Sequence, residues 1–107
     1  MFVDSHAHLT DEKYGGDIAE VINRYREAGV GAVVNAGADM ISTEKSAILA
    51  DEYDDMYFTA GVHPDEAKTL SDEAYLKLKE FAKRKKCVGI GEIGFDFHWM
   101  KSTEEEQ

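Results

Sequence analysis

Short apolar runs alternate along the chain with longer stretches in which apolar residues recur at helical spacing. The apolar runs predict four strands, and the helical stretches between them predict three helices. The predicted strands are residues 2–8, 32–37, 56–62 and 87–93, and the predicted helices are residues 17–28, 42–53 and 71–82. Strands that alternate with helices of this length pair in parallel through right-handed crossovers. The fold class is therefore α/β, built from parallel βα repeats.

Two capping patterns mark predicted helix starts. Asp17 is followed three residues later by Glu20, and Ser102-Thr103-Glu104-Glu105 repeats the pattern near the end of the sequence. Only Glu106 and Gln107 follow the second pattern, whereas each earlier repeat has a complete helix. A frayed acidic tail is the alternative interpretation, but the repeats favour truncation. We therefore expect residues 1–107 to form a single incomplete domain.

Composition narrows the classes of function. The chain has 107 residues, 43% of them hydrophobic, and 22 acidic against 12 basic side chains give a formal charge of -10. This hydrophobic content argues against disorder, and the length suits one core. A simple electrostatic nucleic-acid binder would be basic overall. A phosphate ligand would therefore need local cations or a bound metal.

Targeting features are absent from the sequence. No apolar run approaches the roughly 20 residues of a membrane span, and the N-terminus has no basic region followed by an apolar stretch. The single cysteine, Cys87, cannot form an internal disulfide. We therefore expect a cytoplasmic protein without a membrane partner.

The first predicted strand carries Asp4, His6 and His8 at spacing i, i+2, i+4. In an extended strand these side chains share one face. Imidazole suits zinc, iron or manganese, and a carboxylate keeps harder ions possible. An alternative role for Asp4 is to orient a histidine from outside the ligand shell. A pair of surface histidines near a turn is the competing interpretation, but the upstream carboxylate favours a metal site.

Glu92 closes the fourth apolar run, and Val88 and Ile90 share its face by alternation. A carboxylate placed inward at a strand end is costly unless it is paired or metal-bound. Taken alone, Glu92 is better explained as a solvated acid at the end of a strand. Asp96 is a candidate for a second-shell or loop-fixing carboxylate, and an Asx turn is an equally good account of it.

Further candidates lie in the loops after the strands. His63 precedes Pro64, which favours an extended backbone; a metal ligand, a phosphate contact and a turn histidine all remain open. His98 and Trp99 could stack on a base, although aromatic closure of a barrel mouth is the simpler interpretation. His6 and His8, His63, and Glu92 lie at the C-terminal ends of three different predicted strands. In parallel barrels the active site lies at this end of the strands.

Three segments resemble the TatD family of metal-dependent deoxyribonucleases, which belongs to the amidohydrolase-like hydrolases. They are residues 4–9 (DSHAHL), 61–64 (GVHP) and 89–96 (GIGEIGFD). The histidine motif is shared by the whole superfamily and is only moderately specific, whereas the other two motifs in combination are much more so. The motifs stand in family order, and the resemblance runs the length of the chain.

The resemblance implies a TIM-type (β/α)8 barrel enzyme that hydrolyses phosphodiester bonds in DNA, often from a 3′ end. It implies that His6 and His8 bind one divalent metal (Mg, Mn or Zn), that Glu92 bridges two such ions, and that His63 faces the scissile phosphate. Glu92 and His63 are accordingly the catalytic candidates. Asp4 and Asp96 are candidates for second-shell or substrate contacts. One or two ions suit this chemistry, because metals activate water and neutralise developing phosphate charge.

The chain also departs from the family pattern. A barrel needs eight strands and about 250 residues, whereas four strands are predicted here, and the family's later ligands, two histidines and an aspartate, have no counterpart. We therefore expect the first four βα units of such a barrel, in a chain that is inactive alone. We also expect self-association through open sheet edges, or marginal stability. An amide- or lactone-bond hydrolase and a non-catalytic, self-associating fragment are the alternatives.

Overall fold

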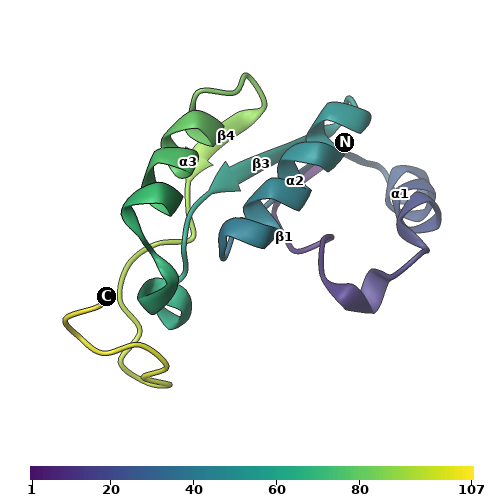
Figure 1. The fold of residues 1–107 in the computed structure, drawn as a ribbon. Coiled ribbons are helices and arrows are strands. Elements are labelled where there is room, and N and C mark those ends of the chain that lie inside the picture. Colours follow the sequence, from purple (N-terminus) through teal and green to yellow (C-terminus); the bar gives the residue numbers. More distant parts are fainter.

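The computed structural model describes residues 1–107 and contains one four-stranded parallel sheet (Figure 1). The strands follow chain order across the sheet, from β1 at one edge to β4 at the other. Their bounds are β1 Phe2–Ala7, β2 Val30–Asn35, β3 Met56–Ala60 and β4 Cys87–Ile90. The predicted parallel βα architecture is confirmed. The last strand is shorter than predicted, so Glu92 lies just beyond it.

Three α-helices and two short 3-10 helices connect the strands. The α-helices are α1 Ile18–Glu27, α2 Met40–Glu52 and α3 Asp72–Ala82, and the 3-10 helices are η1 Glu12–Tyr14 and η2 Pro64–Thr69. Helices α2 and α3 lie over the same face of the sheet, and α1 stands apart from them (Figure 1). The strand that α1 contacts is β2. Each α-helix falls within two residues of its predicted position.

The start of α2 was predicted two residues late. Asp39 is the N-cap: its carboxylate accepts a bond from the Ser42 amide (2.7 Å), and the Ser42 hydroxyl accepts one from the Asp39 amide (3.0 Å). Ser42 is thus the third helical residue of a reciprocal capping box and not the first residue of the helix. Serine in that place satisfies the N-cap amide as a glutamate would, so this capping box lacks the usual Glu or Gln.

Both predicted capping boxes need correction. Asp17 occupies the N-cap of α1, but its side chain makes no capping hydrogen bond. The second box lies one residue later than predicted: the Thr103 amide donates to Glu106 Oε1 (3.0 Å), and the Glu106 amide donates to Thr103 Oγ1 (3.2 Å). These residues form a turn, not a helix. Ser102 is instead buried, with 2% of its surface exposed.

The hydrophobic core lies between the sheet and the two covering helices. Ala47 and Ala50 of α2 pack on Phe58 and Ala60 of β3, and all four are at most 2% exposed. Leu78, Phe81 and Cys87 close the cluster from the side of α3 and β4. Alanines on the contacting face of α2 let the helix approach the strand closely. This core fixes β3 and β4, whose ends carry His63 and Glu92.

The other face of the sheet is largely uncovered. Val88 and Ile90 of β4 are 54% and 61% exposed, which agrees with their predicted place on the open face. The whole chain exposes 6893 Å², against roughly 6,000 Å² for a compact monomer of this mass. The difference is what an uncovered sheet face would produce. Glu92 follows this strand by two residues.

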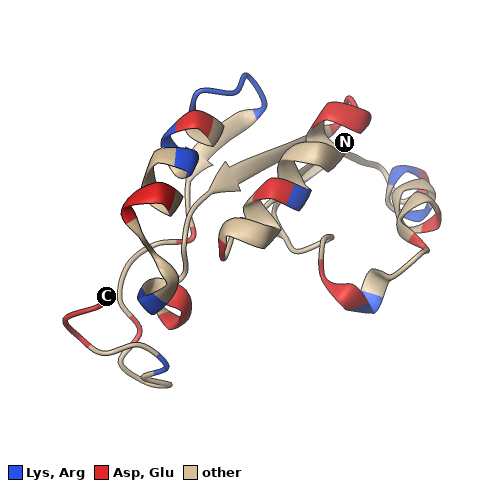
Figure 2. Cartoon of the chain, in the orientation of Figure 1, with Lys and Arg blue, Asp and Glu red and all other residues tan.

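Charge is distributed unevenly around this framework (Figure 2). The basic run Lys83–Lys86 lies in the loop before β4, at the opposite end of that strand from Glu92. Its last member, Lys86, donates to the backbone carbonyls of Tyr53, Asp54 and Met56 at 2.9–3.2 Å. Lys86 therefore holds the α2–β3 turn and belongs to the scaffold. None of the helices is long and apolar enough to cross a membrane.

Candidate metal centre

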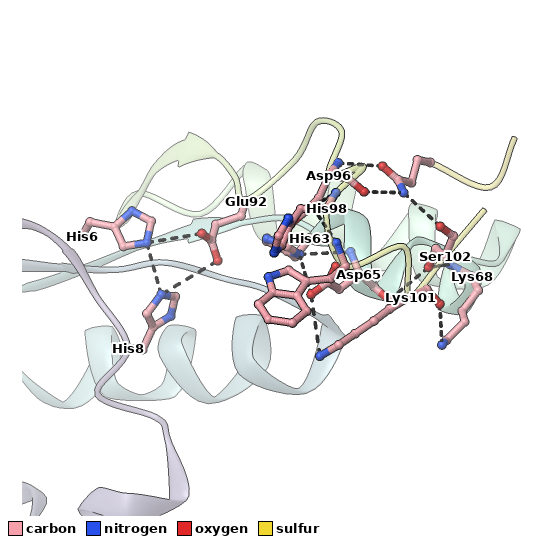
Figure 3. A network of polar contacts seen from close by, with 12 residues as sticks. His6, His8, His63, Asp65, Lys68, Glu92, Asp96, His98, Lys101 and Ser102 are labelled. Carbon is pink, nitrogen blue, oxygen red and sulfur yellow. Dashed lines mark hydrogen bonds and ion pairs between the residues drawn. The ribbon is translucent and has the colours of Figure 1, made fainter. Parts of the chain in front are cut away.

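The end of β1 presents two histidine rings to the same point. His6 lies in β1, and His8 follows the strand by one residue. Their Nε2 atoms are 3.2 Å apart, and the rings meet edge to face with centroids 5.0 Å apart (Figure 3). The i, i+2 spacing in an extended backbone explains this convergence, because alternate side chains share a face.

Glu92 reaches the same point from the segment after β4. Its Oε1 lies 3.4 Å from His6 Nε2, and its Oε2 lies 3.9 Å from His8 Nε2 (Figure 3). One donor atom from each of the three residues falls within 4.8 Å of the others. The Glu92 side chain is 27% exposed, so the carboxylate is partly withdrawn from water. The structure thus brings together the three residues that the sequence nominated as metal ligands.

The spacing of these donors suits a small divalent cation. Zinc bound tetrahedrally at 2.0–2.1 Å from imidazole nitrogen separates neighbouring ligand atoms by about 3.4 Å. The two separations from His6 Nε2, 3.2 Å to His8 Nε2 and 3.4 Å to Glu92 Oε1, are close to that value. His8 Nε2 lies 3.9 Å from the other carboxylate oxygen, Oε2. Two imidazoles and a carboxylate also form a ligand set that manganese or iron accepts. The residues present therefore fit a metal ion.

Asp4 does not join this group. Its Oδ1 accepts a hydrogen bond from the backbone amide of His6 at 3.0 Å. The carboxylate therefore fixes the backbone from which the His6 ring projects. This contact is with the backbone and not with the imidazole, so the proposed role of Asp4 in orienting a histidine stays a prediction.

His63 lies outside the three-residue group and caps η2. Its Nδ1 accepts a hydrogen bond from the Asp65 amide at 3.0 Å, so in the neutral ring Nε2 carries the proton. The His63 amide donates to the Ala38 carbonyl (2.8 Å), and the Glu92 amide donates to the adjacent Gly37 carbonyl. Two consecutive carbonyls after β2 thereby hold the backbones of both catalytic candidates.

Asp96 organises the loop that follows Glu92. Its carboxylate accepts from the amides of His98 (2.9 Å) and Trp99 (3.3 Å). The hydrogen bond from the His98 amide is the main cause that holds the pKa of Asp96 below its ordinary value. Partial desolvation raises this pKa, whereas the Trp99 amide and the charges of His63 and His98 lower it further. This is the loop-fixing Asx arrangement that the sequence allowed. Figure 3 shows Asp96, His98 and His63 next to one another.

One polar group near the centre was missed by reasoning from the sequence. The Thr59 hydroxyl accepts from the Gly37 amide (3.2 Å) and donates to the Gly91 carbonyl (2.9 Å). Thr59 sits in a strand of otherwise apolar residues, and that isolated hydroxyl was the available signal. Alone it does not indicate a partner, because threonine is common in strands.

A family comparison gives this geometry its context. The family model described as TatD related DNase matches residues 3–107. The chain belongs to the TatD-related DNase family. The resemblance proposed from the three motifs is confirmed, and so is the fold class that it implied.

Relatives of this TatD-family chain are substantially longer than 107 residues. It is 37% identical over 107 residues to the "uncharacterized metal-dependent hydrolase YabD" of Bacillus subtilis, covering 100% of this chain and 42% of the relative. It is 36% identical over 104 residues to the "3'-5' ssDNA/RNA exonuclease TatD" of Cronobacter sakazakii, covering 97% and 40%. The chain thus spans about 40% of the length of the curated relatives it matches.

Solved structures of the family share the fold. A hydrolase of the TatD family from Entamoeba histolytica superposes with a TM-score of 0.88 at 28% identity, over 98% of this chain and 41% of that one. The TatD homologue YJJV from Escherichia coli superposes with a TM-score of 0.81 at 30% identity, over 90% and 38%. The four βα units of the chain therefore match about two fifths of these family members.

Proposed function

We propose that the chain carries part of the metal centre of a TatD-type hydrolase that cleaves phosphodiester bonds in nucleic acid. The convergence of His6, His8 and Glu92 within 4.8 Å carries this proposal. Relatives named as a metal-dependent hydrolase and as an exonuclease on single-stranded DNA and RNA support it. Residues 1–107 are then one domain that supplies the first four βα units of a barrel.

The three donors divide the work of holding the ion. The Nε2 atoms of His6 and His8 would bind one divalent cation together with one oxygen of Glu92. The second carboxylate oxygen of Glu92 would be available to a further ion, so the residues would suit one or two ions of Mg, Mn or Zn. Asp4 would keep the His6 backbone in place, as its bond to that amide indicates.

The residues around the ion would act on the substrate. A bound divalent cation supplies positive charge for the scissile phosphate and lowers the pKa of a water molecule. His63 has its Nδ1 engaged by the Asp65 amide, so its Nε2–H is the group left to donate to a phosphate oxygen. Asp96 holds the loop beside His63. Because the chain is acidic overall, the metal would carry much of the attraction for a polyanion.

Partner and location follow from the same picture. We propose that the isolated chain associates with a second copy, because both outer strands have unpaired edges and one sheet face is open. The lone cysteine, Cys87, is free, which supports a reducing compartment such as the cytoplasm.

The bond that is cleaved can be tested directly. The chain is incubated with Mn²⁺ and a 5′-labelled single-stranded oligonucleotide, and in parallel with an amide and a lactone substrate. We expect Mn²⁺ to increase oligonucleotide binding by the chain, and any turnover to be of phosphodiester bonds. Glu92→Gln should cancel the effect of Mn²⁺, whereas Glu44→Gln, on α2, should not. Turnover of the amide or lactone instead would favour the alternative hydrolase, and oligonucleotide binding that ignores Mn²⁺ would contradict the proposal.

A further inference from the structure

We propose that the hydroxyl of Thr59 is a positioning group that sets the direction in which Glu92 leaves the backbone. The inference rests on the proposed function in one respect, namely that Glu92 is a ligand of the metal. It assigns to a residue of β3 a role in a centre whose three donors come from β1 and from the segment after β4.

The first support is the pair of hydrogen bonds made by this hydroxyl. Thr59 Oγ1 accepts from the Gly37 amide at 3.2 Å and donates to the Gly91 carbonyl at 2.9 Å. A hydroxyl has one proton and two lone pairs, so both bonds form together. Gly91 directly precedes Glu92, and its carbonyl belongs to the peptide that joins the two residues. Thr59 therefore holds the carbonyl side of that peptide.

The second support is the partner on the other side of the same peptide. The Glu92 amide donates to the Gly37 carbonyl. Gly37 thus receives the Glu92 N–H at its carbonyl and gives its own N–H to Thr59. The Gly91–Glu92 peptide is bound at both its polar groups by this small network, which links the ends of β2, β3 and β4. A peptide plane held at its C=O and N–H has little freedom to rotate.

The third support is steric. A Cβ at Gly61 would overlap the Gly91 carbonyl carbon and lie 2.7 Å from the Glu92 nitrogen, both backbone atoms. The absence of a side chain at Gly61 therefore allows the backbone after β3 to press against this peptide. With two hydrogen bonds and one close contact, the Cα–Cβ direction of Glu92 is strongly restrained before any ion binds.

The hydroxyl of Thr59 does little for the core. The core cluster is formed by residues such as Phe58 and Ala60, whose side chains point to the other face of β3. Thr59 itself is only half-buried. Replacing its hydroxyl by a methyl group leaves the volume nearly unchanged but leaves the Gly37 amide and the Gly91 carbonyl without this partner. The consequence should therefore appear mainly at Glu92.

The test compares Thr59→Val with Thr59→Ser, which restores the hydroxyl. Ser46→Ala is the matched control, because it removes a fully buried hydroxyl on α2 that makes no hydrogen bond. Zn²⁺ affinity is measured by calorimetry on the 107-residue chain, and amide hydrogen exchange is followed at Glu92 and at Phe58. Removal of groups that orient metal ligands typically lowers metal affinity 10–100-fold.

We expect Thr59→Val to bind Zn²⁺ at least about tenfold more weakly, while Thr59→Ser and Ser46→Ala stay close to the parent chain. The Glu92 amide should exchange faster in the valine variant, with Phe58 unchanged. Equal Zn²⁺ affinity in Thr59→Val and the parent would overturn the inference. If the parent itself binds no Zn²⁺, the metal assignment fails, and the hydrogen-exchange data alone decide on the role of Thr59. Faster exchange in Thr59→Val that is confined to the Glu92 amide supports positioning by Thr59. Unchanged exchange at Glu92, or faster exchange at both Glu92 and Phe58, overturns it.

Discussion

His6 Nε2 lies 3.4 Å from Glu92 Oε1, although β1 and β4 are the two outermost strands of the sheet. Neighbouring strands are about 4.8 Å apart, so three intervals would separate these strands by about 14 Å in a flat sheet. The contact therefore requires the sheet to curl, with both side chains directed to its concave face. This is the curvature of a barrel, and it exists here with only four strands present.

The acid stability of the chain should depend on Asp55, which ties α1 to the turn before β3. Asp55 accepts two bonds from Arg26 (both 2.8 Å) and one from Tyr25 (3.0 Å). The Arg26 guanidinium is the main cause that lowers the pKa of Asp55, and burial opposes it. Burial, with the bond to Asp55 second, raises the pKa of Tyr25 to about 12.

A carboxyl group whose pKa is lowered on folding stabilises the folded state above its unfolded pKa and loses that contribution as the pH falls through the folded value. Asp55 has an ordinary value of 3.8, so the loss should occur below about pH 4. We expect the free energy of unfolding, measured in urea at pH 6 and pH 3, to fall more in the parent chain than in Asp55→Asn. Asp51→Asn, which removes an exposed ion pair and keeps Asp55, should lose as much stability as the parent. If Asp55→Asn and the parent lose the same free energy of unfolding between pH 6 and pH 3, the Asp55–Arg26 ion pair is not the source of the acid sensitivity.

Self-association of the isolated chain should be measurable by light scattering during size-exclusion chromatography. The excess of 6893 Å² over roughly 6,000 Å² is about 900 Å² per chain, close to the roughly 800 Å² that each partner buries in a standard interface. We expect a mass above that of a monomer, which rises with concentration. Ile90→Lys, on the open sheet face, should shift the chain toward monomer, and Leu76→Lys, on exposed α3, should not. A parent chain that elutes as a monomer at all concentrations and unfolds cooperatively on heating would contradict this prediction.

Ser102 should stabilise the contact between the final loop and η2. Its hydroxyl donates to the Asp65 carbonyl (3.0 Å) and accepts from the Lys68 amide (3.2 Å). Ser102→Ala leaves the partly buried Asp65 carbonyl and the amide of exposed Lys68 without this partner, at a local cost of about 1 kcal/mol. We expect the Lys68 amide to exchange hydrogen at least about fivefold faster, since 1 kcal/mol corresponds to about that factor. Thr103→Ala, at the exposed neighbouring turn, should leave the exchange rate of the Lys68 amide unchanged. If the Lys68 amide stays protected in Ser102→Ala, the Ser102 hydroxyl does not hold the final loop on η2.

The parts of the fold that could be predicted are those set by local pattern. Parallel strands and their order follow from apolar runs separated by helical spacing, and both are observed. The pairing of His6 with His8 follows from strand alternation. The position of Glu92 near these histidines follows from topology, because the carboxyl ends of parallel strands meet at one end of a barrel.

What could not be predicted depends on partners distant in sequence. The roles of Thr59 and Gly61 arise from contacts with residues after β4, about thirty positions away, which no local rule of spacing reveals. The same applies to Ser102, whose hydroxyl suggested a helix cap and instead bonds to η2. Ser102 is buried and its hydroxyl is bonded to η2, so the neighbouring Thr103 makes the capping bond to the amide of Glu106.

The central claim is that His6, His8 and Glu92 hold one divalent cation. Calorimetric titration of the chain with Zn²⁺ tests it most directly, with His6→Ala and Glu92→Gln as site variants and His98→Ala, an exposed histidine outside the group, as control. The account predicts one site in the parent and in His98→Ala, weakened at least about tenfold in both site variants. Zn²⁺ binding that is absent in the parent, or that is unchanged by His6→Ala and Glu92→Gln, would contradict it.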